Sequence, residues 1–324
     1  MEDLLSIENL SIEYEIERGA LKAVTDVSFS IRRGEFFGLA GESGCGKSTI
    51  AFSIMRLLKG ASKVSGGEIK FNGKNVLAFD REQLRLFRWE KTSMVLQSAM
   101  NNLNPVVTIS SQLIDAIVAH RDVSKSEAYK MSEELLTMVN IDPSRLNSYP
   151  HELSGGMRQR VVIAMAMALQ PDLIILDEPT TALDVVVQYN IIRKILEFKH
   201  TAGFSILFIT HDLPLMLEVC DRIGIMYAGR MAELATSEQL KKGGTHPYSK
   251  GLLRAFPSIL GEKKRLEGIP GSVPDLVTPP PGCLFYERCT YRTDTCIQSI
   301  PEFSKISEDH FCACHNREQV LSHG

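Results

Sequence analysis

Long apolar runs and an excess of positive charge are both missing from this 324-residue sequence. The longest apolar run, residues 161–169, is far shorter than the ~18 residues that a membrane-spanning helix needs. The acidic start Met1-Glu2-Asp3 lacks the basic-then-apolar plan of a signal peptide. A formal net charge of −3 gives no general basic footprint for nucleic acid. We therefore expect a protein that does not bind nucleic acid and that works at a membrane only through a partner.

Cysteine is scarce along most of the chain. Only Cys45 and Cys220 precede residue 283, whereas five of the seven cysteines fall between residues 283 and 314. This distribution excludes a disulfide framework for the whole chain and indicates a local cofactor or disulfide patch. The remaining composition, 44% hydrophobic and 23% charged, is ordinary for a globular protein, and the length suggests roughly two domains.

A glycine-rich loop follows an apolar, strand-like segment at residues 36–40. The run Gly41-Glu42-Ser43-Gly44-Cys45-Gly46-Lys47-Ser48-Thr49 satisfies the pattern G-x-x-x-x-G-K-[ST] between a strand and a helix. Such a loop turns its backbone N–H groups toward phosphates, with Lys47 reaching the β- and γ-phosphates and Ser48 binding Mg²⁺. Cys45 occupies a free position, where we interpret it as a tolerated small residue rather than a redox switch. The predicted nucleotide-binding residues are Gly41, Ser43, Gly44, Cys45, Gly46, Lys47, Ser48 and Thr49.

Polar residues also occur at the ends of two strand-like segments and at the start of a helix-like segment. The apolar residues 173–176 lead to Asp177 and Glu178, and residues 205–210 lead to His211. Strand ends of a parallel α/β sheet line its ligand crevice, so a carboxylate there can hold Mg²⁺. Ser154 is followed by two glycines and a helix-like stretch at residues 157–169. That helix start suits an anion, although an ordinary N-cap without a ligand fits the same three residues.

Together these motifs resemble the ATPases of the ABC family. The run Leu153-Ser154-Gly155-Gly156-Met157-Arg158-Gln159-Arg160 is similar to the family's signature sequence, which binds the ATP held by a second subunit. The resemblance implies Mg²⁺-dependent ATP hydrolysis, with Ser154, Gly155 and Gly156 serving the partner's site. The remaining implied roles are adenine stacking by Tyr14, contact with the metal and the attacking water by Gln97, Mg²⁺ binding by Asp177, polarisation of the water by Glu178, a dimer-interface position for Asp184, and γ-phosphate sensing by His211.

The expected fold is an α/β P-loop NTPase core of the ABC type, followed by a cysteine-rich extension. We expect the ATPase domain at residues 1–235, with a mixed sheet, helices, and an N-terminal antiparallel β subdomain. Residues 4–31 predict two β segments of it, with alternation at residues 10–16 and, less cleanly, at residues 24–31. A helical subdomain is expected as an insert at about residues 98–160, where residues 108–140 carry helical periodicity. The extension, residues 236–324, should open with a short helix near residues 246–256 and continue as a proline-rich arm with little regular structure.

Three chemistries compete for the cysteines of the extension, spaced Cys283-x5-Cys289-x6-Cys296-x17-Cys314. Disulfides are disfavoured, because a protein that hydrolyses ATP works in a reducing cytosol. Structural zinc stays open, although the paired C-x2-4-C knuckle is missing. Four thiolates on a [4Fe–4S] cluster fit the cysteine count.

A second resemblance bears on these cysteines. After a proline-rich lead-in, the pairs Gly282-Cys283 and Arg288-Cys289 and the later Cys314-His315 resemble the C-terminal motif of oligopeptide and dipeptide importer ATPases. This implies an iron–sulfur cluster on Cys283, Cys289, Cys296 and Cys314, with zinc as the alternative and Cys312 as a spare or as a substitute for Cys314.

The two resemblances cover essentially the whole chain and imply a transport machine. The chain would be the peripheral ATPase at the cytoplasmic face of a membrane, working with two transmembrane permease subunits and, indirectly, an extracytoplasmic substrate-binding protein. Met157 and residues 163–166 resemble the D-type subunit, which implies a heterodimer with an F-type paralogue. The open alternatives are import of oligosaccharides or nickel, a soluble ABC ATPase acting on ribosomes or DNA, and an iron–sulfur redox protein with a vestigial nucleotide site.

Overall fold

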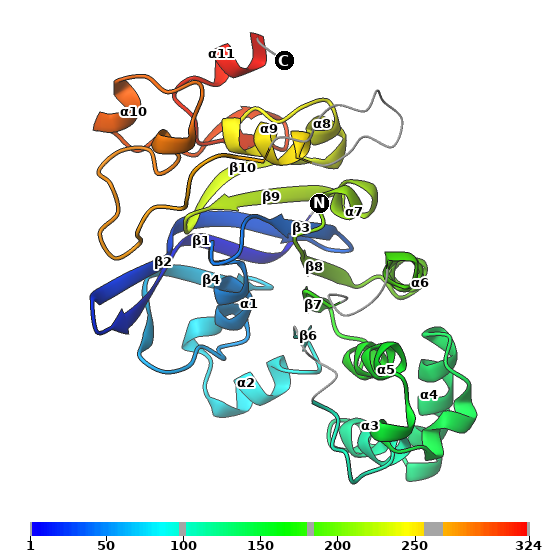
Figure 1. Ribbon diagram of the computed structural model, residues 1–324. Helices are drawn as coiled ribbons and strands as arrows, with labels where there is room; N and C mark the ends of the chain where they lie inside the picture. Colours follow the sequence, from blue (N-terminus) through cyan, green and yellow to red (C-terminus); the bar gives the residue numbers. More distant parts are fainter. Residues whose placement is uncertain (1, 97–101, 180–184, 256–267, 323–324) are drawn as a thin grey trace. The chain divides into compact units, whose positions relative to one another are not determined.

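The computed structural model describes residues 2–96, 102–179, 185–255 and 268–322, which fall into two compact units (Figure 1). The helical unit contains residues 33–35 and 79–208, and the sheet unit contains residues 2–32, 36–78 and 209–324. Within the described ranges, no helix is long and apolar enough to cross a membrane. The residues of both units are interleaved in the sequence, so each unit is assembled from distant segments.

The sheet unit begins with a four-stranded antiparallel sheet in the order β2-β1-β4-β5. This confirms the two β segments expected within residues 4–31, and β1 extends before the alternating residues 10–16. The pattern is interrupted because β1 has register shifts against β2 around Asn9, whose φ is +49°. The strands are β1 Asp3–Ile16, β2 Gly19–Arg32, β4 Ser62–Phe71 and β5 Lys74–Asn75.

A mixed run of strands forms the second sheet of the sheet unit, in the order β11-β12-β10-β9-β3. The β9–β3 pair is parallel and the other pairs are antiparallel. Sequence patterns did not indicate β11 and β12, which come from the extension; β12 pairs with the edge of β10, and β11 pairs with β12. The strands are β3 Phe36–Ala40, β9 Arg222–Tyr227, β10 Arg230–Thr236, β11 Ser304–Ser307 and β12 His310–Cys312.

Short helices accompany these strands, and α8 and α9 lie against β10 (Figure 1). Caps define several of them: Asp212 accepts the N–H of Leu215 at the start of α7, and Thr236 forms a capping box with Gln239 at the start of α8. Residues 268–283 carry no regular element, as expected for the proline-rich arm. The helices are α1 Lys47–Ile54, α7 Leu213–Val219, α8 Ser237–Lys241, α9 Pro247–Arg254, α10 Thr295–Gln298 and α11 Arg317–Ser322, with 3-10 turns η1 Val76–Ala78 and η5 Tyr286–Arg288.

The helical unit contains three fully or mostly buried strands in the order β8-β7-β6, and β6 pairs with β7 in parallel. Helices α3, α4 and α5 pack on one another, and Ile109, Leu113 and Ile117 of α3 are buried at the predicted helical spacing. The elements are α2 Arg81–Phe87, β6 Thr92–Val95, α3 Ile109–Val118, α4 Lys125–Met138, η3 Pro143–Asn147, η4 Pro150–Glu152, α5 Gly155–Met167, β7 Leu173–Asp177, α6 Val185–Ala202 and β8 Ser205–Ile209.

Candidate nucleotide-binding site

The loop between β3 and α1 has a backbone that requires glycine at both ends. Gly41 has φ +147° and Gly46 has φ +105°, conformations that side chains rarely adopt. A Cβ atom at Gly41 would lie 2.3 Å from the carbonyl oxygen of Met226, and one at Gly46 would lie 2.6 Å from that of Ala23. Gly46 is also the N-cap of α1, so the first N–H groups of this helix follow directly from the loop. The local geometry is that of a phosphate-binding loop.

Lys47 folds back over this loop. Its side chain is nearly buried, and its ammonium donates to the carbonyl oxygens of Gly41 (2.7 Å) and Glu42 (3.0 Å). A phosphate oxygen bound in the loop can replace these carbonyl contacts at the same ammonium. Burial raises the pKa of the neighbouring Cys45 thiol, which keeps it protonated and fits its interpretation as a small packing residue.

An aromatic ring lies beside the start of α1. Tyr14, half-buried on β1, places its hydroxyl 3.5 Å from the hydroxyl of Thr49. Ser48, the second residue of α1, is half-buried, whereas Ser43 and Gly44 are exposed at the loop tip. The predicted loop residues and Tyr14 are therefore gathered in one place within the sheet unit.

The two predicted carboxylates end β7 in the helical unit. Asp177 is the last residue of the strand and is only 3% exposed, while Glu178 is half-buried with φ +49°. A left-handed backbone at a residue with a side chain costs about 1–2 kcal/mol and is concentrated at functional sites. The chain thus turns sharply right after Asp177. Two other predicted residues, Gln97 and Asp184, lie outside the described residues.

The predicted helix start at Ser154 is confirmed. Ser154 is the N-cap of α5 and its hydroxyl accepts the N–H of Met157 at 3.3 Å. The helix includes Gly155 and Gly156 and so begins two residues before the stretch that the sequence favoured. Ser154 is exposed and both glycines are half-buried.

His211 follows β8 in the link to α7 and is exposed. It belongs to the sheet unit, as the phosphate loop does, whereas Asp177, Glu178 and Ser154 belong to the helical unit. The predicted residues are thus divided between the two compact units.

Four cysteines of the extension line one small cavity: Cys283, Cys289, Cys296 and Cys314. Burial raises the pKa of Cys283 to about 11 and that of Cys314 to about 12, so both are thiols at neutral pH. Cys312 is fully buried on β12 and is not among the residues lining this cavity. All seven cysteines are free, and no three His, Cys, Asp or Glu side chains of the described ranges are placed to hold a single metal ion.

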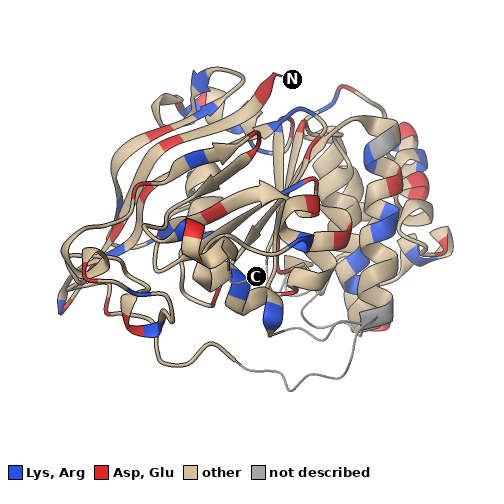
Figure 2. Ribbon diagram, turned by 90° about the horizontal axis from the view of Figure 1, so that it is seen from above, with Lys and Arg blue, Asp and Glu red and all other residues tan. Residues whose placement is uncertain are grey.

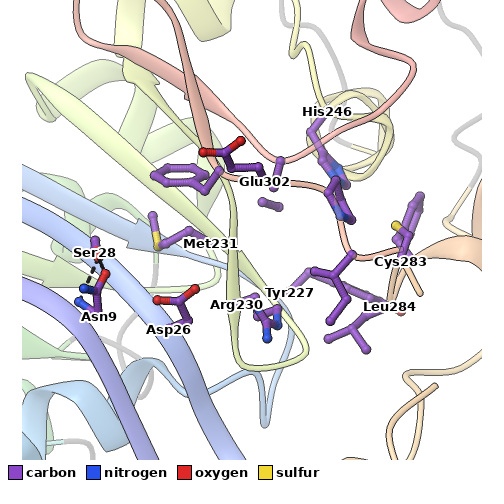
Figure 3. A pocket seen from close by; sticks show the side chains of 16 residues that line it. Asn9, Asp26, Ser28, Tyr227, Arg230, Met231, His246, Cys283, Leu284 and Glu302 are labelled. Carbon is purple, nitrogen blue, oxygen red and sulfur yellow. Dashed lines mark hydrogen bonds between the residues drawn. The ribbon is translucent and has the colours of Figure 1, made fainter. Parts of the chain in front are cut away.

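A larger cavity of the sheet unit, about 480 Å³, has a different lining (Figure 3). Asp26, Arg230 and Glu302 contribute charges of both signs, and residues 41–49 are not among those lining it. Basic and acidic residues are also interspersed along the ribbon seen in Figure 2. The loop, rather than this cavity, therefore carries the chemistry suited to a polyphosphate.

Two residues that support the loop, Arg288 and Tyr248, were not identified from the sequence as part of the site. Arg288 forms an ion pair with Glu42, and the hydroxyl of Tyr248 accepts the N–H of Glu42. Little in the sequence indicates this contact. Arg288 is distinctive only as part of an Arg-Cys pair, and Glu42 occupies a position of the loop pattern that accepts any residue.

Comparison with known proteins agrees with this geometry. A family model described as ABC transporter matches residues 24–181, and one described as oligopeptide/dipeptide transporter, C-terminal region, matches residues 232–296. A probable peptide ABC transporter ATP-binding protein of Sinorhizobium fredii is 43% identical, with 98% of this chain and 96% of the relative covered. The dipeptide transport ATP-binding protein of Bacillus subtilis is 42% identical, with 100% and 97% covered, and the oligopeptide transport ATP-binding protein of Escherichia coli is 40% identical, with 98% and 94% covered.

Solved structures give the same result for the fold. A dimeric ABC transporter cassette, MJ0796, superposes with a TM-score of 0.66 at 28% identity, with 72% of this chain and 98% of the cassette covered. A second structure of that cassette, described as a dimeric post-hydrolysis state bound to ADP and Pi, gives a TM-score of 0.65 over the same shares of both chains.

Proposed function

The chain belongs to the ATP-binding proteins of oligopeptide and dipeptide ABC transporters, and we propose that its ATPase activity drives uptake of dipeptides and oligopeptides through membrane permease subunits. The observation that carries the proposal is the full-length similarity to peptide transport ATP-binding proteins, joined to an intact phosphate loop. Peptides are assigned as cargo because the relatives are named as peptide, dipeptide and oligopeptide transport proteins. Oligosaccharides and nickel stay alternatives for the same machine.

ATP binding is assigned to the loop between β3 and α1. Backbone N–H groups of the loop and of the first turn of α1 attract the phosphates, and Lys47 adds a positive charge at the loop mouth. Tyr14 stacks on the adenine ring. A Mg²⁺ ion bound with ATP neutralises phosphate charge, and the hydroxyl of Ser48 and the carboxylate of Asp177 are the hard oxygen donors that suit it.

The signature turn, residues 154–156, serves a second ATP site. Its exposed Ser154 and the N-terminus of α5 present N–H groups and a partial positive charge away from the core. We assign this surface to the ATP held by another ABC ATPase subunit, an F-type paralogue of this D-type chain. Each ATP then lies between two chains, so ATP favours a closed dimer and loss of the γ-phosphate reopens it.

We assign hydrolysis to three residues whose roles follow from the family resemblance. Glu178, at its left-handed turn after β7, polarises the attacking water, and His211 contacts the γ-phosphate. Gln97 contacts the metal and the water and begins the helical insert, residues 98–160, that passes the motion to the permeases. Asp184 lies at the dimer interface. The chain thereby works as a peripheral subunit at the cytoplasmic face of the membrane, with the ATPase domain ending near residue 235.

The test uses the complex purified with its permeases in lipid vesicles and a peptide-loaded binding protein. Changing Glu178→Gln should lower ATP hydrolysis about 10²–10³-fold while ATP binding persists, because a transition-state group is removed and the phosphate loop is kept. A Glu152→Gln variant, changed in the 3-10 turn η4 before the signature turn, is the matched control and should hydrolyse ATP normally. Near-normal hydrolysis by the Glu178 variant rejects the catalytic assignment, and absence of peptide-stimulated hydrolysis in the unaltered complex rejects the cargo.

The four cysteines that line one cavity support a [4Fe–4S] cluster as a structural cofactor of the extension. Each thiolate of such a cluster binds its own iron atom, so the sulfurs need not converge on one point as they do around zinc. Cys283, Cys289, Cys296 and Cys314 would hold the cluster, and loading would release protons at least from Cys283 and Cys314, whose pKa values are raised by burial. The cluster would pin a proline-rich arm that has few regular elements of its own.

Two neighbouring cysteines give a matched test of this cofactor. Cys314→Ser should remove iron, acid-labile sulfide and brown colour from anaerobically purified protein, whereas Cys312→Ser should keep them because Cys312 is buried away from the cavity. Zinc without iron in the unaltered protein would reject the cluster, and loss of iron from the Cys312 variant alone would reassign the fourth ligand.

A further inference from the structure

Glu42, the residue after the first loop glycine, is held on three sides. Its backbone N–H donates to the hydroxyl of Tyr248 (3.0 Å), its carbonyl accepts from Lys47 (3.0 Å), and its carboxylate accepts from Arg288. Tyr248 lies on α9 and Arg288 ends the turn η5. Two of the three contacts therefore come from beyond residue 235, and the conformation of the phosphate loop depends on the extension.

The contact between Arg288 and Glu42 is a bidentate ion pair. Nη1 of Arg288 lies 2.8 Å from Oε2 of Glu42, and Nη2 lies 2.9 Å from Oε1. The arginine side chain is 6% exposed and the glutamate side chain 29% exposed. Fork-to-fork geometry at such low exposure distinguishes this pair from the exposed ion pairs of the molecule, which contribute little.

Every N–H group of the Arg288 side chain has a hydrogen-bond acceptor. Besides its two bonds to Glu42, Nε donates to the carbonyl of Pro270 (2.8 Å), Nη2 to that of Ile269 (3.2 Å), and Nη1 to the hydroxyl of Tyr227 (3.4 Å). These bonds use the five N–H groups of a guanidinium, and the proline-rich arm supplies two of the acceptors. A lysine has three donors and no planar fork, so it cannot reproduce this arrangement.

Aromatic rings enclose the same guanidinium. Its central carbon lies 5.6 Å from the ring centre of Tyr227 and 5.9 Å from that of Phe285, and the rings of Tyr227 and Tyr248 are 4.7 Å apart. Tyr227 and its neighbour Cys283 are labelled in Figure 3. These rings pack on one another in tilted and edge-to-face arrangements, and rings packed around a desolvated cation hold the guanidinium in the orientation in which it meets Glu42.

The negative charge of Glu42 explains why its ion pair with Arg288 matters for binding phosphates. A carboxylate in a loop that receives phosphates repels them, and the repulsion is weakly screened where the groups are half-buried. From the juxtaposition of Arg288, Tyr248 and Glu42 we propose that the extension is part of the ATP site, with Arg288 neutralising Glu42 and, together with Tyr248, positioning the phosphate loop. This inference rests on the ATP binding proposed above.

Equilibrium binding of Mg²⁺ and ribose-labelled fluorescent ATP to the full chain tests the inference. Arg288→Gln should weaken ATP binding about tenfold or more, because it leaves the Glu42 charge without its partner. Adding Glu42→Gln to that variant should restore the affinity to within about threefold, because the repelling charge is then gone. The loss in the single variant should also shrink as salt is raised, which a purely structural defect would not do.

A matched control and a milder variant complete the test. Arg18→Gln breaks another ion pair between the extension and an N-terminal strand turn, Arg18 with Asp275, but that pair is exposed and should not affect ATP binding. Tyr248→Phe keeps the ring and removes the acceptor of the Glu42 N–H, so about fivefold weaker binding is expected even if Arg288→Gln fails to fold.

The contrary outcomes are distinct. Unchanged ATP affinity in Arg288→Gln, or in Tyr248→Phe where the arginine variant does not fold, overturns the inference. A double variant that binds as weakly as Arg288→Gln overturns the charge argument, since Arg288 would then act through folding alone. Failure of the unaltered chain to bind labelled ATP overturns the proposed function itself.

Discussion

The phosphate loop (residues 41–47) and the signature turn (residues 154–156) are both glycine-containing starts of helices, yet the chain holds them very differently. In the loop, Cys45 and Lys47 are buried, and Glu42 is bonded through its N–H, its carbonyl and its carboxylate. In the signature turn, Ser154 is exposed and its side chain makes an N-cap bond of 3.3 Å to Met157. One helix start is enclosed by its own chain, and the other is presented outward.

This difference corresponds to two ways of making an anion site. The loop must keep backbone conformations that only glycine adopts easily, and Tyr248 of α9 and Arg288, both in the extension, hold it through Glu42. The signature turn is an ordinary capped helix start, which needs no strain and few supports. Its N–H groups are useful when a ligand is brought to them, which agrees with the proposed site shared between two subunits.

The largest expected effect is a loss of ATP affinity, and it should differ between small substitutions at the two helix starts. Gly46→Ala should weaken binding of labelled ATP to the isolated chain about 100-fold or more, because its Cβ would lie 2.6 Å from the carbonyl oxygen of Ala23 at φ +105°. Ser154→Ala should leave that binding within about twofold, because the loop is untouched and about 1 kcal/mol of cap energy is lost locally. In the complete transporter, Ser154→Ala should nevertheless slow ATP hydrolysis roughly tenfold or more, through a lost contact to the partner's ATP.

The control for this comparison is Gly73→Ala. Gly73 also has a positive φ, +73°, but nothing lies within 4 Å of the added Cβ, so backbone strain occurs without a clash and far along the chain from the loop. Normal ATP affinity is expected. If Ser154→Ala weakened ATP binding to the isolated chain as much as Gly46→Ala did, the two helix starts would serve one ATP site in one chain rather than two different ATP molecules.

The same contrast explains what could be predicted from the sequence. The loop pattern, the N-cap at Ser154 and the strand ending at Asp177 are local features, and each is found where its residues predicted it. The support of Glu42 by Arg288 joins residues 246 positions apart, so no local pattern contains it. Strands β11 and β12 were missed for a related reason: they are short, and what fixes them is pairing, of β12 with the edge of β10 and of β11 with β12, rather than their own alternation.

The positive φ of Glu178 shows the other limit of sequence reasoning. Two acids after an apolar strand predict a strand end with carboxylates, but not that the second acid takes a left-handed conformation at +49°. Local propensity opposes that conformation, so the surrounding structure must impose it. Departures from local preference of this kind are expected where function, rather than folding, selects the geometry.

The smallest expected effect concerns a clamp of the extension that does not touch the loop. Asp309, in the turn between β11 and β12, pairs with Arg32 at the end of β2, and this hydrogen-bonded partner lowers its pKa below the usual 3.8. A lowered folded-state pKa stabilises the protein above the unfolded value, and this contribution disappears as pH falls through the folded value. Asp309→Asn should therefore cost about 1 kcal/mol or less at pH 7, and the thermal unfolding of both proteins should converge only as the pH falls through the lowered folded-state pKa of Asp309. ATP affinity should stay normal, because the conformation of the loop depends on Glu42 and its partners. If Asp309→Asn lowered ATP affinity as much as Arg288→Gln does, the whole extension, and not the contact between Arg288 and Glu42 alone, would support the loop.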